Sequence, residues 1–193
     1  MVDGVLLLVD AYEGTMPQTR FVLKKALEAN VKPIVIINKV DKPTARLQEV
    51  IDEVIDLFIE LGATDEQLDF KVAYVSALNG TASLDPEPST QSEDYSCIYD
   101  LIINEIPAPK ADPSASLKFQ PALLDYNEFV GRIGVGCIKS GTIKENEMVS
   151  CLRLDGSIKQ FRIQKLFGFL GLKRIEIKEA HAGDIVAIAG LPD

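Results

Sequence analysis

The segment Asn38-Lys39-Val40-Asp41 gathers an amide, an ammonium and a carboxylate directly after the apolar run at residues 34–37. A short continuous apolar run predicts a parallel strand that is covered on both faces. In open α/β sheets, ligands bind at the carboxyl ends of such strands. A carboxylate there can accept hydrogen bonds from the ring N–H and the exocyclic amine of guanine, whereas adenine lacks that pair of donors. Because an unpaired buried carboxylate is costly, Asp41 would select for guanine.

A second segment, Ser76-Ala77-Leu78, follows the next predicted strand, at residues 70–75. Small residues at a strand end let backbone N–H groups approach a ligand. Taken alone, Asn38-Lys39-Val40-Asp41 is also consistent with a polar strand-end loop that contains an Asn-Asp turn. The occurrence of both segments after neighbouring strands favours a single ligand site at one edge of a sheet.

Strand and helix signals alternate through the first half of the chain. Apolar runs predict strands at residues 5–9 and 34–37, and a third strand is expected at 70–75. The spacing of Thr15-Met16-Pro17-Gln18 predicts a capped helix start. Apolar residues at helical spacing predict a helix over 47–61 that Gly62 ends, and a further helix spans 98–106. Residues 79–94 are rich in Ser, Thr, Pro and acidic residues and predict a surface loop. This order predicts a parallel sheet with helices on both faces.

The second half has a different composition and a different period. Residues 1–106 carry 8 basic and 19 acidic side chains, and residues 107–193 carry 12 and 10. Prolines at 107 and 109 indicate a linker, so we expect domains at 1–108 and 109–193. Short β-branched or aromatic segments separated by turns predict a small antiparallel β-barrel, with strands near 117–124, 132–138, 147–154, 157–165, 172–178 and 184–189.

Asn-Lys-x-Asp followed by Ser-Ala-Leu resembles the guanine-specifying motifs of the translation-factor GTPases. Flanking segments such as Glu13-Gly14-Thr15-Met16-Pro17-Gln18-Thr19 and Gly131-Arg132-Ile133-Gly134 are similar to the TypA/BipA family, and the likeness covers essentially all 193 residues. The resemblance implies a cytoplasmic, ribosome-associated GTPase with a partial Ras-like G domain followed by a β-barrel domain II. Its partners would be guanine nucleotide and ribosomal RNA, without a membrane.

The family pattern also implies roles for individual residues. Asn38 would brace the pocket, the Lys39 stem would pack on the base plane, and Asp41 would read the ring. The Ser76-Ala77 backbone would meet the guanine oxygen, and Leu78 completes the motif.

The residues that handle phosphate in this family are not found in the sequence. There is no GxxxxGK[ST] segment, no switch threonine and no Asp-x-x-Gly element, so the chain resembles an internal piece of the family. We therefore expect no catalytic residues, no GTP hydrolysis by this chain, and GTP or GDP affinity that is weak or absent, roughly millimolar or about −4 kcal/mol. Magnesium is expected only in a longer parent protein. The strand at 5–9 would then present an unpaired edge, through which we expect self-association.

A basic segment within the second half is a candidate RNA-facing surface. It also contains phenylalanines, so the alternative is that these form the barrel core while the cations are merely solvated. Six cations within twenty residues of an acidic chain favour a phosphate-facing surface, and the candidates are Lys159, Arg162, Lys165, Lys173, Arg174 and Lys178. The alternative overall function is accordingly a short, non-catalytic protein that binds ribosomal RNA through the barrel.

Charge and composition exclude several other classes. With 20 basic and 29 acidic residues, the net charge of −9 excludes a uniformly basic nucleic-acid binder. No apolar run approaches the roughly 20 residues of a membrane span. The first residues do not show a basic stretch followed by an apolar core and a cleavage site, so we do not expect secretion. Three cysteines without a CxxC pair indicate a reduced protein. Acidic residues at 52, 53, 56 and 60 follow helical spacing, which indicates a solvated helix face and not a metal site.

Overall fold

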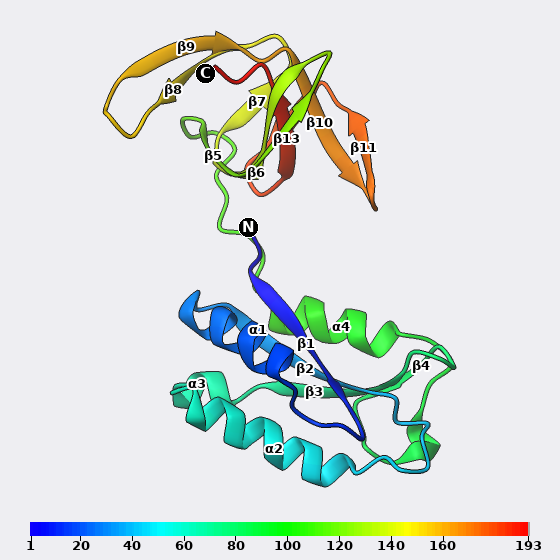
Figure 1. Cartoon of the computed structure of the whole chain (residues 1–193). Helices are drawn as coiled ribbons and strands as arrows, with labels where there is room; N and C mark the ends of the chain where they lie inside the picture. The colour runs from blue at the N-terminus through cyan, green and yellow to red at the C-terminus, as the bar shows by residue number, and fades with distance from the viewer. Residues whose placement is uncertain (193) are drawn as a thin grey trace. The chain divides into compact units, whose positions relative to one another are not determined.

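The computed structural model describes residues 1–192. These divide into two compact units, Val2–Pro107 and the residues from Ala108 onward (Figure 1). Each unit has hydrophobic clusters of its own, so each is held together by its own core.

The first unit is built on a sheet in the order β1-β2-β3-β4. The first three strands are parallel, β4 runs antiparallel to β3, and the bounds are β1 (Gly4–Asp10), β2 (Lys32–Asn38), β3 (Lys71–Ser76) and β4 (Thr81–Ser83). In the register, Asp10 lies opposite Asn38, and Asn38 lies opposite Val75. The carboxyl ends of the parallel strands therefore meet at one edge.

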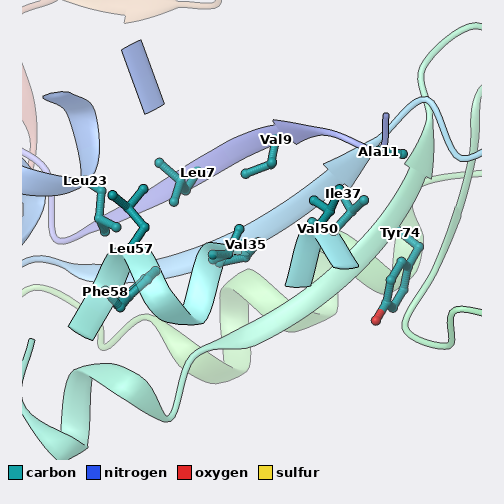
Figure 2. Close-up of a cluster of buried hydrophobic side chains, with 11 residues drawn as sticks. Leu7, Val9, Ala11, Leu23, Val35, Ile37, Val50, Leu57, Phe58 and Tyr74 are labelled. Atoms are coloured by element: carbon teal, nitrogen blue, oxygen red, sulfur yellow. The ribbon is translucent and has the colours of Figure 1, made fainter. Parts of the chain in front are cut away.

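Helices cover both faces of this sheet, as the alternation of strands and helices predicts. They are α1 (Pro17–Glu28), α2 (Leu47–Glu60), α3 (Asp65–Leu68) and α4 (Ser96–Glu105). On one face, Leu23 of α1 and Val50 and Phe58 of α2 pack against alternate residues of the strands (Figure 2). On the other face, Ile98 and Leu101 of α4 pack against Ile34 and Ile36 of β2 and against residues of β3 and β4.

Three local features differ from expectation. The expected loop at 79–94 contains β4 and a short 3-10 helix, Pro88–Thr90. Ser83 is buried because its hydroxyl bonds that of Thr90 at 2.8 Å, an arrangement that no apolar pattern reveals. Helix α1 is capped at Met16 and not at Thr15, because the Met16 N–H donates to the Thr19 hydroxyl at 3.3 Å.

Helix α2 ends where the sequence indicates, with Gly62 in the left-handed region at φ +75°. Its acidic face is more than a solvated surface. Glu53 pairs with Arg46 at 2.6 Å and Glu60 pairs with Arg20 at 2.5 Å, so two of these carboxylates hold neighbouring segments in place.

The second unit is antiparallel β structure, as expected. A five-stranded sheet in the order β11-β10-β13-β6-β5 is joined by the pairs β12-β7 and β8-β9. These sheets share a core that includes Ile138, Ile163 and Leu166. The strands are β5 (Lys118–Asn127), β6 (Gly131–Ser140), β7 (Thr142–Lys144), β8 (Met148–Leu152), β9 (Ile158–Arg162), β10 (Lys165–Leu170), β11 (Lys173–Glu176), β12 (Glu179–His181) and β13 (Ile185–Ala189).

Strand boundaries in this unit differ from the predicted ones. The expected strand at 157–165 ends at Arg162, and the next strand, β10, was not expected at all. Leu166 in β10 is buried while Phe169 and Leu170 are exposed, so the segment has no simple two-residue alternation. Strands β7 and β12 have three residues each, which is too short to show a period.

Strand β1 lies at the edge of the first unit's sheet among the described residues, where it pairs with β2 alone. Leu6 and Leu8 of this strand are 39% and 58% exposed. Its free backbone groups and these leucines form an unpaired edge, as expected from the sequence.

Candidate nucleotide-binding site

Polar side chains lie at the ends of all three parallel strands. Asp10 ends β1, Asn38 ends β2 and Ser76 ends β3. The Asn38 side-chain oxygen Oδ1 accepts the backbone N–H of Lys39 at 2.8 Å and that of Ala77 at 3.2 Å. One amide therefore ties the loop after β2 to the loop after β3, which brings the two candidate motifs together.

Lys39 has a backbone conformation that non-glycine residues rarely adopt. Its φ is +69°, in the left-handed region, where an L-residue loses about 1–2 kcal/mol. Its N–H is held by Asn38 Oδ1, and its carbonyl accepts the N–H of Lys42 at 3.2 Å. Such strain persists only where the surroundings hold it, and it is concentrated at functional sites.

The Lys39 side chain reaches back to the end of β1. Its Nζ lies 2.5 Å from Asp10 Oδ2, and the lysine side chain stays 48% exposed while that of Asp10 is 14% exposed. The other Asp10 oxygen, Oδ1, accepts the backbone N–H groups of Tyr12 at 2.9 Å and Glu13 at 3.2 Å. The hydrogen bond from Lys39, opposed by burial and aided by these N–H groups, lowers the pKa of Asp10 to about 2. The same bond raises the pKa of Lys39.

Asp41 is exposed, and its carboxylate makes no hydrogen bond or ion pair with the described part of the chain. It lies beside a cavity of about 130 Å³, lined by Val40, Asp41, Leu47, Ser76, Thr81, Pro86, Pro88 and Gln91. The carboxylate that the sequence assigns to base reading is thus available to a ligand.

The loop after β3 presents its backbone in a specific way. Ser76 is buried and its hydroxyl accepts the N–H of Asn79 at 3.2 Å, while Ala77 and Leu78 are exposed. The Ala77 N–H is engaged by Asn38, so it is not open as the family pattern implies. Among the described residues, the Leu78 N–H has no acceptor and is the donor left for a ligand.

Two residues at this edge were not recognised from the sequence. Asp10 holds Lys39, and Arg46 holds the β1–α1 loop because its Nε donates to the Tyr12 carbonyl at 2.6 Å. Arg46 also pairs with Glu53, which accepts the N–H of Thr15 at 3.2 Å. A polar residue directly after the apolar run at 5–9 was the available signal for Asp10, because the two recognised segments begin in the same way.

The six cations of the second unit lie on more than one sheet. Lys159 and Arg162 are on β9, Lys165 is on β10, Lys173 and Arg174 are on β11, and Lys178 follows β11. Lys165 pairs with Glu145 at 3.4 Å and Glu176 at 2.9 Å, and Arg174 pairs with Asp125 at 2.7 Å. Within residues 1–192, no ion pair involves the exposed cations Lys159, Arg162, Lys173 and Lys178.

The phenylalanines between these cations belong partly to the core. Phe161 and Phe167 pack against buried clusters, while Phe169 is 40% exposed. Among residues 1–192, no helix is long and apolar enough to cross a membrane, and no group of His, Cys, Asp and Glu side chains could hold a metal ion.

This sheet, with guanine-type motifs at two strand ends and a β domain after it, defines a GTP-binding domain of the translation-factor class. Residues 1–117 match the model of the elongation factor Tu GTP binding domain, and residues 131–193 match that of elongation factor Tu domain 2. The chain therefore belongs to the elongation factor Tu GTP-binding domain family.

Curated relatives of high identity to this chain are BipA proteins. The chain is 60% identical over 193 residues to the large ribosomal subunit assembly factor BipA of Bacillus subtilis (strain 168). It is 52% identical over 191 residues to BipA of Escherichia coli (strain K12). The alignments cover 100% and 99% of this chain but 31% of each relative, so the chain spans less than a third of their length. The resemblance to TypA/BipA is confirmed at the level of the family.

Solved structures support the fold. Elongation factor SelB from Methanococcus maripaludis, in the apo form, matches with a TM-score of 0.71 at 19% identity, over 100% of this chain and 37% of that one. GDP-bound aIF5B from Aeropyrum pernix matches with a TM-score of 0.67 at 18% identity, over 97% and 36%. At this identity the likeness concerns the fold alone, a mixed α/β sheet followed by an antiparallel β domain.

Proposed function

We propose that residues 1–108 of this chain recognise the guanine base of GTP or GDP, as part of a BipA-like ribosome-associated GTPase. The observation that carries the proposal is the Asn38 side chain, which accepts one N–H from each motif loop. These two hydrogen bonds link the loop that carries the free carboxylate of Asp41 to the loop that carries the open N–H of Leu78, at one edge of the sheet. A guanine offers two donors to the first and a carbonyl oxygen to the second.

Each residue has a distinct part in this recognition. Asp41 accepts from the ring N–H and the exocyclic amine, Lys39 lays its aliphatic stem along the base plane, and the loop of Ser76, Ala77 and Leu78 supplies the N–H for the guanine oxygen. Adenine has no donor pair for Asp41, so its binding would leave the carboxylate unpaired.

The chain is proposed to bind the nucleotide without hydrolysing it. Phosphoryl transfer depends on groups that position phosphate, magnesium and water. The sequence has no GxxxxGK[ST] segment for the phosphates, and the matched relatives are about three times longer. Magnesium and catalysis are assigned to residues of a longer parent. Phosphate release above background, in a preparation free of contaminating GTPase, would refute this.

A nucleotide titration tests the base assignment. GMP, IMP and AMP are added to the ¹⁵N-labelled chain and followed by NMR, because millimolar affinities are accessible to this method. GMP should bind best, IMP more weakly because it lacks the exocyclic amine, and AMP least. Asp41→Asn replaces an acceptor by a donor and should remove the preference for GMP. Equal binding of GMP and AMP to the unchanged chain would overturn the proposal.

We further propose that residues 109–193 form a domain II that faces ribosomal RNA in the cytoplasm. The matched relatives are described as large ribosomal subunit assembly factors. Four exposed cations of the basic segment, Lys159, Arg162, Lys173 and Lys178, make no ion pair within the described residues and are available to phosphate. The alternative function is that of a short, non-catalytic ribosome-binding protein that acts through this domain alone.

Ribosome co-sedimentation across a salt series tests the RNA-facing surface. Charge reversal at Lys173 should weaken binding and flatten its salt dependence, because fewer counterions are released. Reversal at Lys165 should also break its pairs with Glu145 and Glu176, so Lys173→Glu is the cleaner variant. Lys110→Glu is the charge-matched control, because Lys110 is an exposed lysine outside the basic segment that makes no ion pair within the described residues. Unchanged co-sedimentation of Lys173→Glu at every salt concentration would contradict the assignment.

A further inference from the structure

We propose that Asp10 is a positioning residue for guanine recognition, because it holds the Lys39 side chain in the arrangement that receives the base. The proposal rests on the proposed function of Asn38-Lys39-Val40-Asp41 and adds a residue that neither motif contains. Asp10 ends β1, and its Cα is the register partner of Asn38 in the parallel β1–β2 ladder.

Lys39 is fixed at both ends of its side chain. At the backbone, the positive φ of +69° is held by the bond from its N–H to Asn38 Oδ1. At the far end, Nζ lies 2.5 Å from Asp10 Oδ2. The four-carbon stem between these points has little rotational freedom left, although a free lysine is among the most flexible side chains.

The Asp10 carboxylate is itself a rigid anchor. Its Oδ1 accepts the backbone N–H groups of Tyr12 and Glu13 at 2.9 and 3.2 Å, and its side chain is only 14% exposed. Arg46, the residue directly before α2, fixes the same loop by donating to the Tyr12 carbonyl at 2.6 Å. The position of the Lys39 ammonium therefore follows from the backbone of the β1–α1 loop.

The exposure of the Lys39–Asp10 pair favours a role in ligand binding over a role in folding stability. The Lys39 side chain is 48% exposed, and ion pairs of this kind contribute little to folding stability. The exposed side of the stem is left open for a flat ligand. A stem that is already ordered loses less freedom when a base packs on it, and this strengthens binding without a new contact.

The test compares Asp10→Asn with the unchanged chain. Asparagine keeps a side-chain oxygen for the N–H groups of Tyr12 and Glu13 but loses the charge that holds Lys39, so the turn and the ion pair are separated. Asp69→Asn is the matched control, because it makes the same chemical change at an exposed carboxylate that pairs with Lys71, the first residue of β3. GMP and AMP are the probes, added to the ¹⁵N-labelled chain and followed by NMR.

We expect Asp10→Asn to bind GMP about three- to tenfold more weakly, since the lysine stem must then be ordered on binding. Asp69→Asn should bind GMP like the unchanged chain. A second readout needs no ligand: the Lys39 Cε resonance, followed against pH, should show a raised pKa that falls toward the ordinary lysine value in Asp10→Asn. A purely structural role for Asp10 would leave that pKa unaltered while the fold is intact.

The outcomes separate the two proposals. Selective GMP binding that is the same in Asp10→Asn overturns the role of Asp10 and leaves guanine recognition standing. Tighter GMP binding in Asp10→Asn would mean that Asp10 withholds Lys39 from the ligand, which also overturns it. A Lys39 ammonium that titrates as an ordinary lysine in the unchanged chain refutes the anchored stem directly. Absence of any preference for GMP over AMP in the unchanged chain overturns both proposals together.

Discussion

Replacement of Asn38 by alanine is the perturbation that the site geometry describes most fully. The Asn38 Oδ1 atom accepts the N–H of Lys39 at 2.8 Å and the N–H of Ala77 at 3.2 Å. A neutral hydrogen bond of this kind contributes about 0.5–1 kcal/mol net, so the loss of both costs about 1–2 kcal/mol. The second bond is the side-chain link between the two motif loops, so we expect the loop after β3 to open locally.

Native-state hydrogen exchange at the Ala77 amide measures this opening. A loss of about 1–2 kcal/mol corresponds to about a 5- to 30-fold fall in protection of that amide. Amides in the centre of β3, such as that of Tyr74, should change less, because they are held by the strand ladder.

Two controls define the cause. Asn38→Asp keeps an acceptor for both N–H groups and strengthens it by charge, so protection of Ala77 should be retained. Asn79→Ala changes an exposed asparagine of the same loop whose side chain has no hydrogen-bond partner in the described part of the chain, and it should also have no effect on Ala77. Equal exchange of the Ala77 amide in the unchanged chain and in Asn38→Ala would refute the assigned role of Asn38.

Three further predictions concern acid stability, the core and the sheet edge. The pKa of Asp10, about 2, lies below its ordinary 3.8, so the pair with Lys39 adds stability above about pH 3.8 that is lost as the pH falls through about 2. Because the Lys39 side chain is 48% exposed, this stability is small: the free energy of unfolding in urea should exceed that of Asp10→Asn by about 0.5–1 kcal/mol at neutral pH, and the difference should vanish near pH 2. Phe58 is fully buried with its ring centroid 4.5 Å from that of Phe70, so Phe58→Ala should cost about 3–5 kcal/mol, and an unchanged urea midpoint would contradict this. The unpaired β1 edge predicts that molar mass in light scattering rises with concentration, and that Leu8→Lys, but not the control Leu172→Lys, suppresses the rise; a monomer at every concentration would refute it.

The elements of the first unit follow closely from its sequence because their signals are physical and local. Continuous apolar runs mark β1 and β2. Strand β2 is covered on both faces, whereas in β1 only the face of Leu7 and Val9 is covered and Leu6 and Leu8 stay exposed. The helical spacing that includes Val50, Val54 and Phe58 marks α2, since these residues all point into one cluster. Strand β4 is not predicted by an apolar pattern, because its buried residues include Ser83. The hydroxyl of Ser83 is satisfied by a hydrogen bond with that of Thr90, which the sequence does not reveal.

The candidate site could be predicted in its residues but not in its connections. Asn38, Asp41 and Ser76 were recognised because their types and spacing suit a guanine base. The pairing of Lys39 with Asp10 joins residues 29 positions apart along the chain and depends on the parallel register of β1 and β2. Register of this kind is set by packing, which a single sequence does not display.

In the second unit, turn signals predicted antiparallel strands, but charge alone did not predict the surface. The basic segment counts six cations in sequence, yet Lys165 and Arg174 are paired with acids that come from outside it, among them Glu145 and Asp125. A count of charges along the sequence leaves these cations available to solvent or RNA, but in the fold they pair with acidic side chains of other segments.

The central claim is that Asp41 and the loop of Ser76-Ala77-Leu78 read a guanine base, and NMR mapping of bound GMP tests it most directly. The account predicts that GMP shifts the amides of Asp41 and Leu78 with roughly millimolar affinity, and that AMP at the same concentration does not. Shifts that are equal for GMP and AMP, or that spare these two amides, would contradict it.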